Sequence, residues 1–217
     1  MKKIKEKLNP QSEAVELFKY AADDVQKMLH YLSATIEAFC KHDEELIEEK
    51  SIATLKTEVK LQVAHQDIVD KMYSRETMNF AREDRLFIIN SLIEIADLAD
   101  FIVRRIRVHH PKMSEDIADI LLTVSADLRK FGGLLEELVL SLLDNFEKAA
   151  KLTWEFHKLE RSMWKYEIEF LNNIYKLGTK PKDTVYYEIL MKNIRLLVMK
   201  SVRFSEGARK LIIKYTF

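Results

Sequence analysis

The scarcity of helix-breaking residues limits the fold of this chain more than any other feature. Only four Gly and three Pro occur in 217 residues. A sheet of many strands needs a turn after each strand, and Gly and Pro are residues that usually form such turns. We therefore expect long helices, and apolar residues recur with the helical period of about 3.6 along almost the whole chain.

The ends of the predicted helices are marked by capping or breaking residues. Asp43 and Ser114 are placed to cap the second and fourth helices. Asp144 begins a stretch that resembles a capping box for the fifth helix. Asp183 is expected to cap the sixth, after a loop that contains Pro181. The predicted helices span about residues 11–41, 43–74, 80–109, 114–142, 144–177 and 183–215.

Helices of this length must pack against one another. Each has an apolar stripe that has to be buried, and short connections make successive helices antiparallel. We predict an all-α fold, an elongated bundle of six long antiparallel helices in a single domain over residues 1–217. The lengths indicate two three-helix repeats, at about residues 11–110 and 114–215. A weak echo supports them, since LKTEVKLQ from Leu55 and HKLERSMW from His157 share a Lys and a Glu at aligned positions.

Composition restricts the class of protein. With 47% hydrophobic and 32% charged residues the chain is globular in character. Its 35 basic and 35 acidic residues balance, so we expect no nucleic-acid partner. The single Cys40 cannot form an internal disulfide, which fits a reducing compartment. With no signal-peptide core and no apolar run long enough to span a bilayer, we expect a soluble cytoplasmic protein, at most peripheral to the inner face of the membrane.

Acidic residues interrupt an otherwise apolar helix at REDRLFIINSLIEIADLADFI, residues 82–102. On a helical wheel Glu94 falls among Phe87, Leu98 and Phe101, so we expect it to be buried. A carboxylate in apolar surroundings loses hydration worth several kcal/mol unless a cation or hydrogen-bond donors replace it. Glu94 should therefore pair with a Lys or Arg of another helix, bind a metal ion, or be less buried than the wheel indicates.

Two further acids of this helix fall outside the apolar arc. Asp97 and Asp100 lie further round the wheel, where a solvated stripe is the simpler interpretation. Asp100 is four residues before Arg104, a spacing that favours a surface ion pair.

The second predicted helix carries polar residues that could meet these acids. Glu58, Gln62 and His65 share one face, and all three can supply oxygen or nitrogen to a metal ion. The alternative is a solvated polar face. In the second half the matching positions are Glu160 and Trp164, of which Trp164 is not a useful ligand and is expected to pack in the core.

Two stretches in the third helix resemble a known family. FARED at Phe80–Asp84 and LIEIAD at Leu92–Asp97 are similar to the third-helix signature of PhoU-like proteins, especially the branch found beside Pit-type inorganic-phosphate transporters. In that branch Phe-Asp-Arg-Glu-Asp opens the helix and Leu-Asp-Asp-x-x-Asp follows. Here Ala81 replaces the first Asp, and Ile93 and Glu94 replace the next two. The opening PQSEAVELFKYAADDVQKML also resembles the first helix of the family.

The resemblance implies two three-helix repeats whose Glu/Asp-x-x-x-Asp motifs hold multinuclear metal clusters. This chain departs from the motif in every copy. In the second repeat Trp164, Val198 and Val202 stand where acids are expected, so we predict no cluster there. The first repeat leaves two alternatives, one divalent or iron-type metal ion or none. Its candidate metal-binding residues are Glu58, Gln62, His65, Glu94 and Asp97.

Other motifs give weaker indications. No zinc-protease, phosphate-loop or Cys-x-x-Cys motif occurs, and His109 and His110 before Pro111 suit a helix end, where cations are favoured. Gly132 and Gly133 indicate a kink or close packing within a helix. Core packing is the expected role of five aromatic residues in the fifth helix, with a partner-binding groove as the alternative. They are Trp154, Trp164, Tyr166, Phe170 and Tyr175.

The expected function follows from the resemblance. It implies a non-enzymatic regulator of phosphate transport that contacts a phosphate transporter or its signalling machinery. The main alternative is a helical adaptor that has lost metal binding and serves another partner, and a metal enzyme on a bundle is a third. A homo-oligomer is compatible with the sequence. The basic segment Lys2–Lys7 is either a plain solvated tail or a contact for anionic lipid or a transporter loop.

Overall fold

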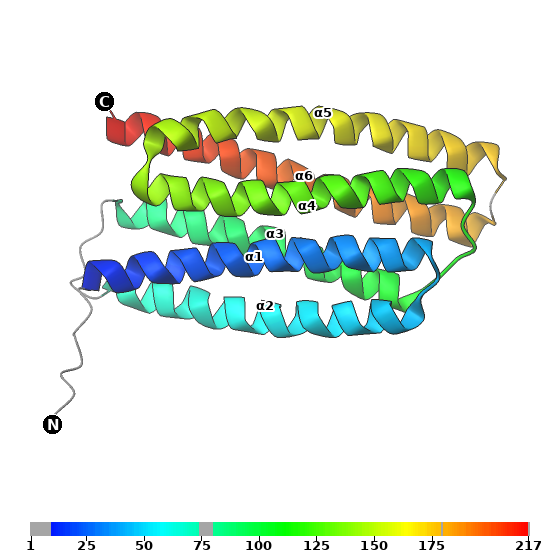
Figure 1. The fold of residues 1–217 in the computed structure, drawn as a ribbon, viewed down its shortest axis with the longest axis horizontal. Coiled ribbons are helices and arrows are strands. Elements are labelled where there is room, and N and C mark those ends of the chain that lie inside the picture. The colour runs from blue at the N-terminus through cyan, green and yellow to red at the C-terminus, as the bar shows by residue number, and fades with distance from the viewer. Residues whose placement is uncertain (1–9, 74–79, 179, 217) are drawn as a thin grey trace, which may run out of the picture.

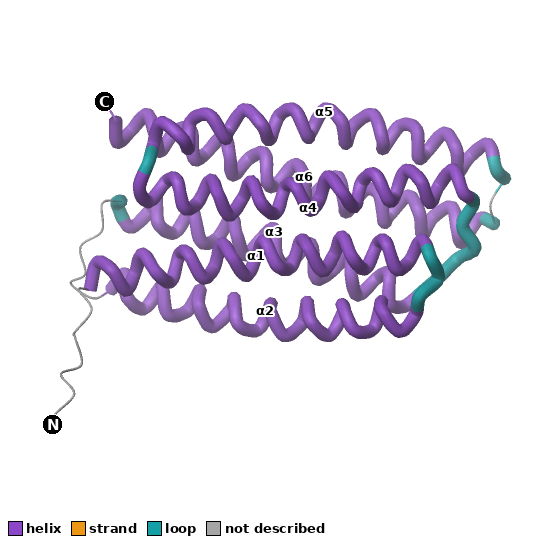
Figure 2. The backbone as a smooth tube through the Cα atoms, in the orientation of Figure 1, coloured by secondary structure: helices purple, strands orange, loops and turns teal. Residues whose placement is uncertain are grey.

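The computed structural model of the chain describes residues 10–73, 80–178 and 180–216. Its regular elements are the six expected helices, with ends close to the predicted ones, and within these ranges no strand occurs (Figures 1 and 2). The basic segment Lys2–Lys7 lies outside the described residues. The helices are α1 (Pro10–Cys40), α2 (Glu44–Tyr73), α3 (Arg82–Val108), α4 (Glu115–Asp144), α5 (Phe146–Lys176) and α6 (Pro181–Thr216).

The helices form an elongated antiparallel bundle. Within α1–α3 every helix contacts the other two, and the same holds within α4–α6. Contacts of α1 with α4 and of α3 with α6 join these two triplets along their length, which leaves α2 and α5 at opposite edges (Figure 1). None of the described helices is both long and apolar enough to cross a bilayer.

Two of the four predicted caps are confirmed. The Asp43 carboxylate accepts a hydrogen bond from the Leu46 amide (3.0 Å), and Ser114 caps α4. The cap of α5 is Asn145, one residue later than predicted, because α5 begins at Phe146. The predicted cap at Asp183 is wrong, since α6 begins at Pro181 and places Asp183 in its first turn.

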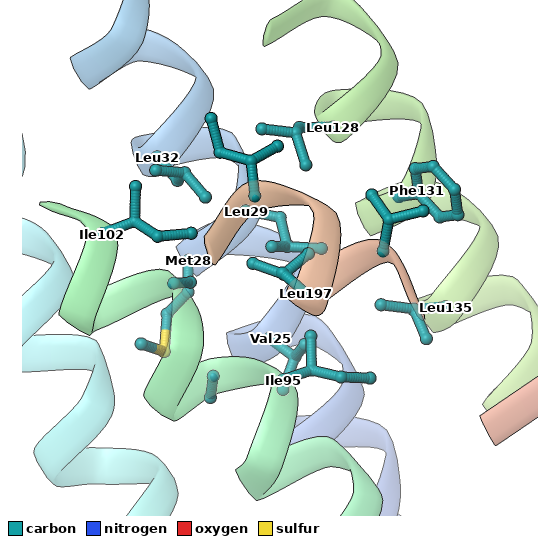
Figure 3. Close-up of a cluster of buried hydrophobic side chains, with 14 of the residues drawn as sticks. Val25, Met28, Leu29, Leu32, Ile95, Ile102, Leu128, Phe131, Leu135 and Leu197 are labelled. Carbon is teal, nitrogen blue, oxygen red and sulfur yellow. The ribbon is translucent and has the colours of Figure 1, made fainter. Parts of the chain in front are cut away.

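The core runs along the joint between the triplets. Its central residues recur every three or four positions, so each helix contributes one apolar stripe. Burying a Leu or Phe side chain fully contributes about 1.5–3 kcal/mol. The prediction of close packing at Gly132 is confirmed, because a Cβ there would lie 3.2 Å from Leu29 Cβ. Fully buried members shown in Figure 3 are Val25, Met28, Leu29, Leu32, Ile95, Ile102, Leu128, Phe131, Leu135 and Leu197.

Candidate functional site

The face shared by α2 and α3 contains three of the candidate metal-binding residues, Glu58, His65 and Asp97. Two contacts fix its antiparallel register. Arg107 binds Glu48 (2.5 Å), and His65 Nε2 lies 3.0 Å from Asn90 Oδ1. Between these two contacts, Glu58 of α2 lies close enough to Asp97 of α3 to act on its charge. Glu58, His65 and Asp97 are therefore brought onto one face.

Asp97 is under electrostatic strain on this face. Burial raises the pKa of its carboxyl, and repulsion from Glu58, Asp100 and Glu94 raises it further. Each of these charges disfavours ionisation of its neighbours. A cation at this point would lower the electrostatic free energy, and carboxylate oxygens are the ligands that hard divalent cations prefer.

The expectation that Glu94 is buried is wrong. Its side chain is 56% exposed, and its carboxylate binds Lys200 of α6 at 2.7 Å. The apolar residues around Glu94 lie at the edge of the interface between α3 and α6, where Phe101 is itself 45% exposed. The predicted pairing with a cation of another helix is confirmed, as is the surface pair of Asp100 with Arg104 (2.6 Å).

The remaining candidates of α2 contribute less to a site. Gln62 is exposed, and the His65 ring is half-buried and bonded to Asn90. Throughout the described ranges, no three His, Cys, Asp or Glu side chains are grouped so that they could hold a metal ion. Of the candidates, Glu58 and Asp97 thus lie near each other, and no cation of the described residues lies between them. Metal binding at this face stays a prediction.

The matching face of the α4–α6 triplet is different. Glu160 lies 3.8 Å from His157, and Glu167 pairs with Arg195 of α6 (3.2 Å). The expectation that Trp164 packs in the core is wrong, since Trp164 is 57% exposed.

The same correction applies to other aromatic residues of α5. Trp154 is 55% and Tyr175 65% exposed, whereas Phe170 is buried as predicted. The core-facing positions of α5 are held by Phe156, Met163 and Phe170. Trp164 follows Met163 by one residue, which turns it about 100° away from the core.

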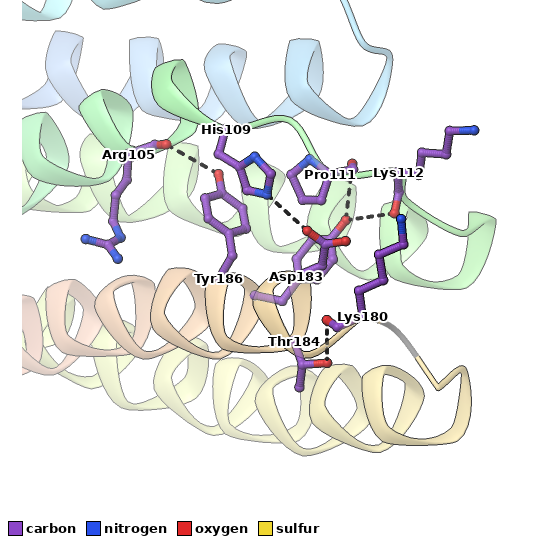
Figure 4. A network of polar contacts seen from close by, with 9 residues as sticks. Arg105, His109, Pro111, Lys112, Lys180, Asp183, Thr184 and Tyr186 are labelled. Carbon is purple, nitrogen blue, oxygen red and sulfur yellow. Dashed lines mark hydrogen bonds and ion pairs between the residues drawn. The ribbon is translucent and has the colours of Figure 1, made fainter.

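A polar network joins the α3–α4 connection to the start of α6 (Figure 4). His109 Nε2 lies 3.0 Å from Asp183 Oδ1, and the Tyr186 ring packs edge-on against the His109 ring. Tyr187 donates to the Lys112 carbonyl (3.3 Å). Burial raises the pKa of both tyrosines, so both stay neutral donors. His109, expected only to complement a helix dipole, therefore also holds α6 in place.

A groove of about 460 Å³ lies beside this network. Two arginines and an imidazole line it together with apolar side chains, and the guanidinium of Arg105 lies 5.7 Å from the centre of the Phe101 ring. The full lining is Phe101, Arg104, Arg105, Val108, His109 and Tyr186.

The residues of the FARED stretch hold the end of α6. Asp84 accepts hydrogen bonds from Lys214 Nζ (2.7 Å) and from the Tyr215 hydroxyl (2.5 Å). The Tyr215 hydroxyl in turn accepts from the Ala81 amide (2.7 Å), and its ring packs edge-on against Phe80. Burial opposes ionisation of Asp84, but the bonds from Lys214 and Tyr215 outweigh it and hold the pKa of the carboxyl below its usual value.

Solved structures of other proteins have the same arrangement of helices. A PhoU-like protein from Shewanella oneidensis MR-1 matches with a TM-score of 0.84 over 92% of this chain and 99% of its own. The chain has the fold of the PhoU-like proteins. A second structure from the same organism, named a PhoU-like phosphate regulatory protein, matches with a TM-score of 0.79 over 93% of this chain and 99% of its own.

The likeness is one of fold. Sequence identity to each of the two structures is 15%. No family model matches the sequence, and no curated protein is similar to it.

Proposed function

We propose that the protein is a non-enzymatic regulator of inorganic phosphate transport that acts by contact with a phosphate transporter or its signalling machinery. The PhoU-like fold, which extends over 92% of the chain, carries this proposal. A neighbour of that fold is named for phosphate regulation. The stretches at Phe80–Asp84 and Leu92–Asp97 add the resemblance to the branch that accompanies Pit-type transporters.

Phosphate uptake in cells tests this role. Cells that lack the protein are expected to take up radioactive phosphate at an altered rate, and the unmodified chain should restore the normal rate. Crosslinking of the tagged protein in intact cells should join it to a phosphate transporter or to the sensor that controls one. Unchanged uptake at both low and high external phosphate, with crosslinks only to unrelated proteins, would contradict the role.

A single divalent ion in the first repeat belongs to the same proposal. Glu58, Asp97 and the neighbouring Gln62 are oxygen donors, which suits a hard cation such as Mg²⁺ or Mn²⁺. The ion would relieve the repulsion that raises the pKa of Asp97. It would hold α2 and α3 together at this point and so present a rigid face to a partner.

The Asp97→Asn substitution tests the ion. Without metal it should stabilise the fold at neutral pH by a few tenths of a kcal/mol, because it removes a charge that is disfavoured by burial and by repulsion from Glu58. Since the folded-state pKa of Asp97 is raised, this gain should disappear as the pH falls and the carboxyl becomes protonated.

Thermal unfolding with added Mn²⁺ completes this test. The melting temperature of the unmodified protein should rise with Mn²⁺, and that of Asp97→Asn should not. Glu167→Gln is the matched control in the second repeat, where Arg195 neutralises the acid, and it should respond like the unmodified chain. An equal rise of the melting temperature in Asp97→Asn would contradict an ion site on this face.

The alternative function is a helical adaptor that has lost metal binding. It is favoured by Trp164, which is exposed where the resemblance implies an acid. An adaptor would leave phosphate uptake unchanged on deletion, and its melting temperature would not respond to Mn²⁺ or other divalent cations.

A further inference from the structure

A row of exposed apolar side chains follows the flank of α5 that borders α6. Helical spacing puts its members on one side of the helix. Two contacts place this side next to α6 (Figure 1), since the Arg209 guanidinium stacks on the Trp154 ring at 4.7 Å and Tyr175 donates a hydrogen bond to Glu188. The row consists of Trp154, Trp164, Ile168 and Tyr175, with exposed fractions of 55%, 57%, 48% and 65%.

Exposed cations surround this row. Arg161 lies within it, seven residues after Trp154, and Lys192 and Arg203 lie on the exposed outer side of α6. In the described parts of the chain none of these three forms an ion pair with a carboxylate. We call this area, formed by the row with Arg161, Lys192, Arg203 and Arg209, the α5–α6 surface.

Acids on the same flank compensate only part of this charge. Glu167 is neutralised by Arg195, and Glu188 accepts the Tyr175 hydroxyl, while Glu206 is exposed. The chain as a whole has a formal net charge of zero. The α5–α6 surface is therefore a local positive excess interleaved with aromatic rings.

The chemistry of the surface distinguishes between possible occupants. A helix that pairs with α5, including a second copy of it, would require branched aliphatic residues along the seam, and here two Trp and one Arg occupy it. Trp and Tyr with interspersed Lys and Arg are instead typical of protein surfaces at the boundary of a bilayer. The row from Trp154 to Tyr175 extends along roughly 30 Å of one continuous helix, which suits an extended surface as partner.

We propose that the α5–α6 surface binds an anionic phospholipid membrane. The indole and phenol rings enter the headgroup region, and the basic side chains contact lipid phosphates, whose negative charge complements theirs. Binding of this kind is peripheral and reversible. The membrane proposal goes beyond the proposed role in phosphate regulation and rests on the α5–α6 surface alone. Either proposal can therefore fail without the other.

Intrinsic fluorescence tests the proposal on the unmodified chain. Both tryptophans of the protein lie on the α5–α6 surface, so their emission reports on this surface alone. With vesicles of phosphatidylcholine containing roughly one-third phosphatidylglycerol, the emission should shift to the blue and the protein should float with the vesicles. Pure phosphatidylcholine vesicles should give a much smaller effect, and added salt should weaken binding because it screens the charges.

Matched variants locate the contact. Arg161→Gln with Lys192→Gln should lower partitioning onto the anionic vesicles by about tenfold. Lys41→Gln with Lys56→Gln removes the same charge from exposed positions on the other half and should leave partitioning unchanged. Trp164→Ala should weaken binding, whereas Tyr20→Ala, an aromatic 61% exposed on α1, should not.

Three results would overturn the proposal. One is the absence of flotation with phosphatidylglycerol vesicles at low salt. Another is an equal loss of binding in the two double variants, which would make the attraction non-specific. A third is a blue shift that grows with protein concentration in the absence of vesicles, because a second copy of the chain would then cover the surface.

Discussion

Leu29→Ala is expected to lower the free energy of unfolding by about 3–5 kcal/mol. Leu29 is fully buried at the centre of α1, where this helix meets α4. Gly132 of α4 already brings the two helices so close that a Cβ on it would lie 3.2 Å from Leu29 Cβ. The helices therefore cannot close much further around a shortened side chain, and most of the removed volume should remain as a cavity.

Urea denaturation followed by circular dichroism and by tryptophan fluorescence measures this loss. Both tryptophans are on α5, so fluorescence follows the second triplet, while circular dichroism follows all six helices. If the joint between the triplets makes them one cooperative domain, both signals should shift together in Leu29→Ala. A fluorescence transition that stays in place would mean that the second triplet unfolds independently.

Leu55→Ala serves as the control for the same chemical change. Leu55 is 43% exposed on the outer side of α2, so shortening it creates no enclosed cavity. Its cost should be about 1 kcal/mol or less. A similar loss in both variants would contradict the central role of the α1–α4 joint.

The fold was predictable because its determinants are local. Every helix carries its own apolar stripe, and the chain contains too few Gly and Pro to interrupt them. Ser114 and Asp43 cap helices through hydrogen bonds that reach only three residues ahead, to Ile117 and Leu46. Such short-range interactions can be recognised in a single sequence, which explains why even the helix ends lie close to the predicted positions.

The side-chain environments were predicted less well. A helical wheel shows which residues share a direction, but not where the neighbouring helix ends and solvent begins. Glu94 shares its direction with apolar residues and is nevertheless 56% exposed, because α6 covers only part of that arc and presents Lys200 to it. The chemistry of Trp164 predicts a place in the core, but this residue follows the core-facing Met163 by one position and is exposed.

Contacts between distant segments were not predictable. His109 and Asp183 are 74 positions apart, and Asp84 and Tyr215 are 131 apart. The chemistry of Asp183 predicts a helix cap. No local signal in the sequence indicates that His109, at the end of another helix, contacts it. Asp84 belongs to the FARED stretch, which resembles a family signature. That resemblance does not predict a hydrogen bond between Asp84 and α6.

Asp84→Asn is expected to cost about 1.5–3 kcal/mol of stability, the range for hydrogen bonds that involve a charged group. The Asp84 side chain is 12% exposed and holds both Lys214 and Tyr215 near the end of α6. An Asn side chain keeps the shape but loses the charge, so Lys214 and Tyr215 should bind more weakly. Amide exchange in the last turns of α6 should become faster than in the rest of the helix.

The effect should depend on pH in a defined direction. The pKa of Asp84 is lowered in the folded state, so folding favours the ionised form. Its contribution is therefore complete above the ordinary carboxyl value of 3.8 and is lost as the pH falls below that value. The difference between the unmodified protein and Asp84→Asn should shrink over the same pH window.

Asp23→Asn is the control for losing one carboxylate charge. Asp23 pairs with Lys27 on the exposed side of α1, where such a pair contributes about 0.3–0.5 kcal/mol. Tyr215→Phe should be destabilising and should not add fully to Asp84→Asn, because it removes the hydrogen bond that Asp84→Asn weakens. If Asp84→Asn instead left stability unchanged while abolishing the response to Mn²⁺ expected at Asp97, the FARED stretch would belong to a metal site and not to the attachment of α6.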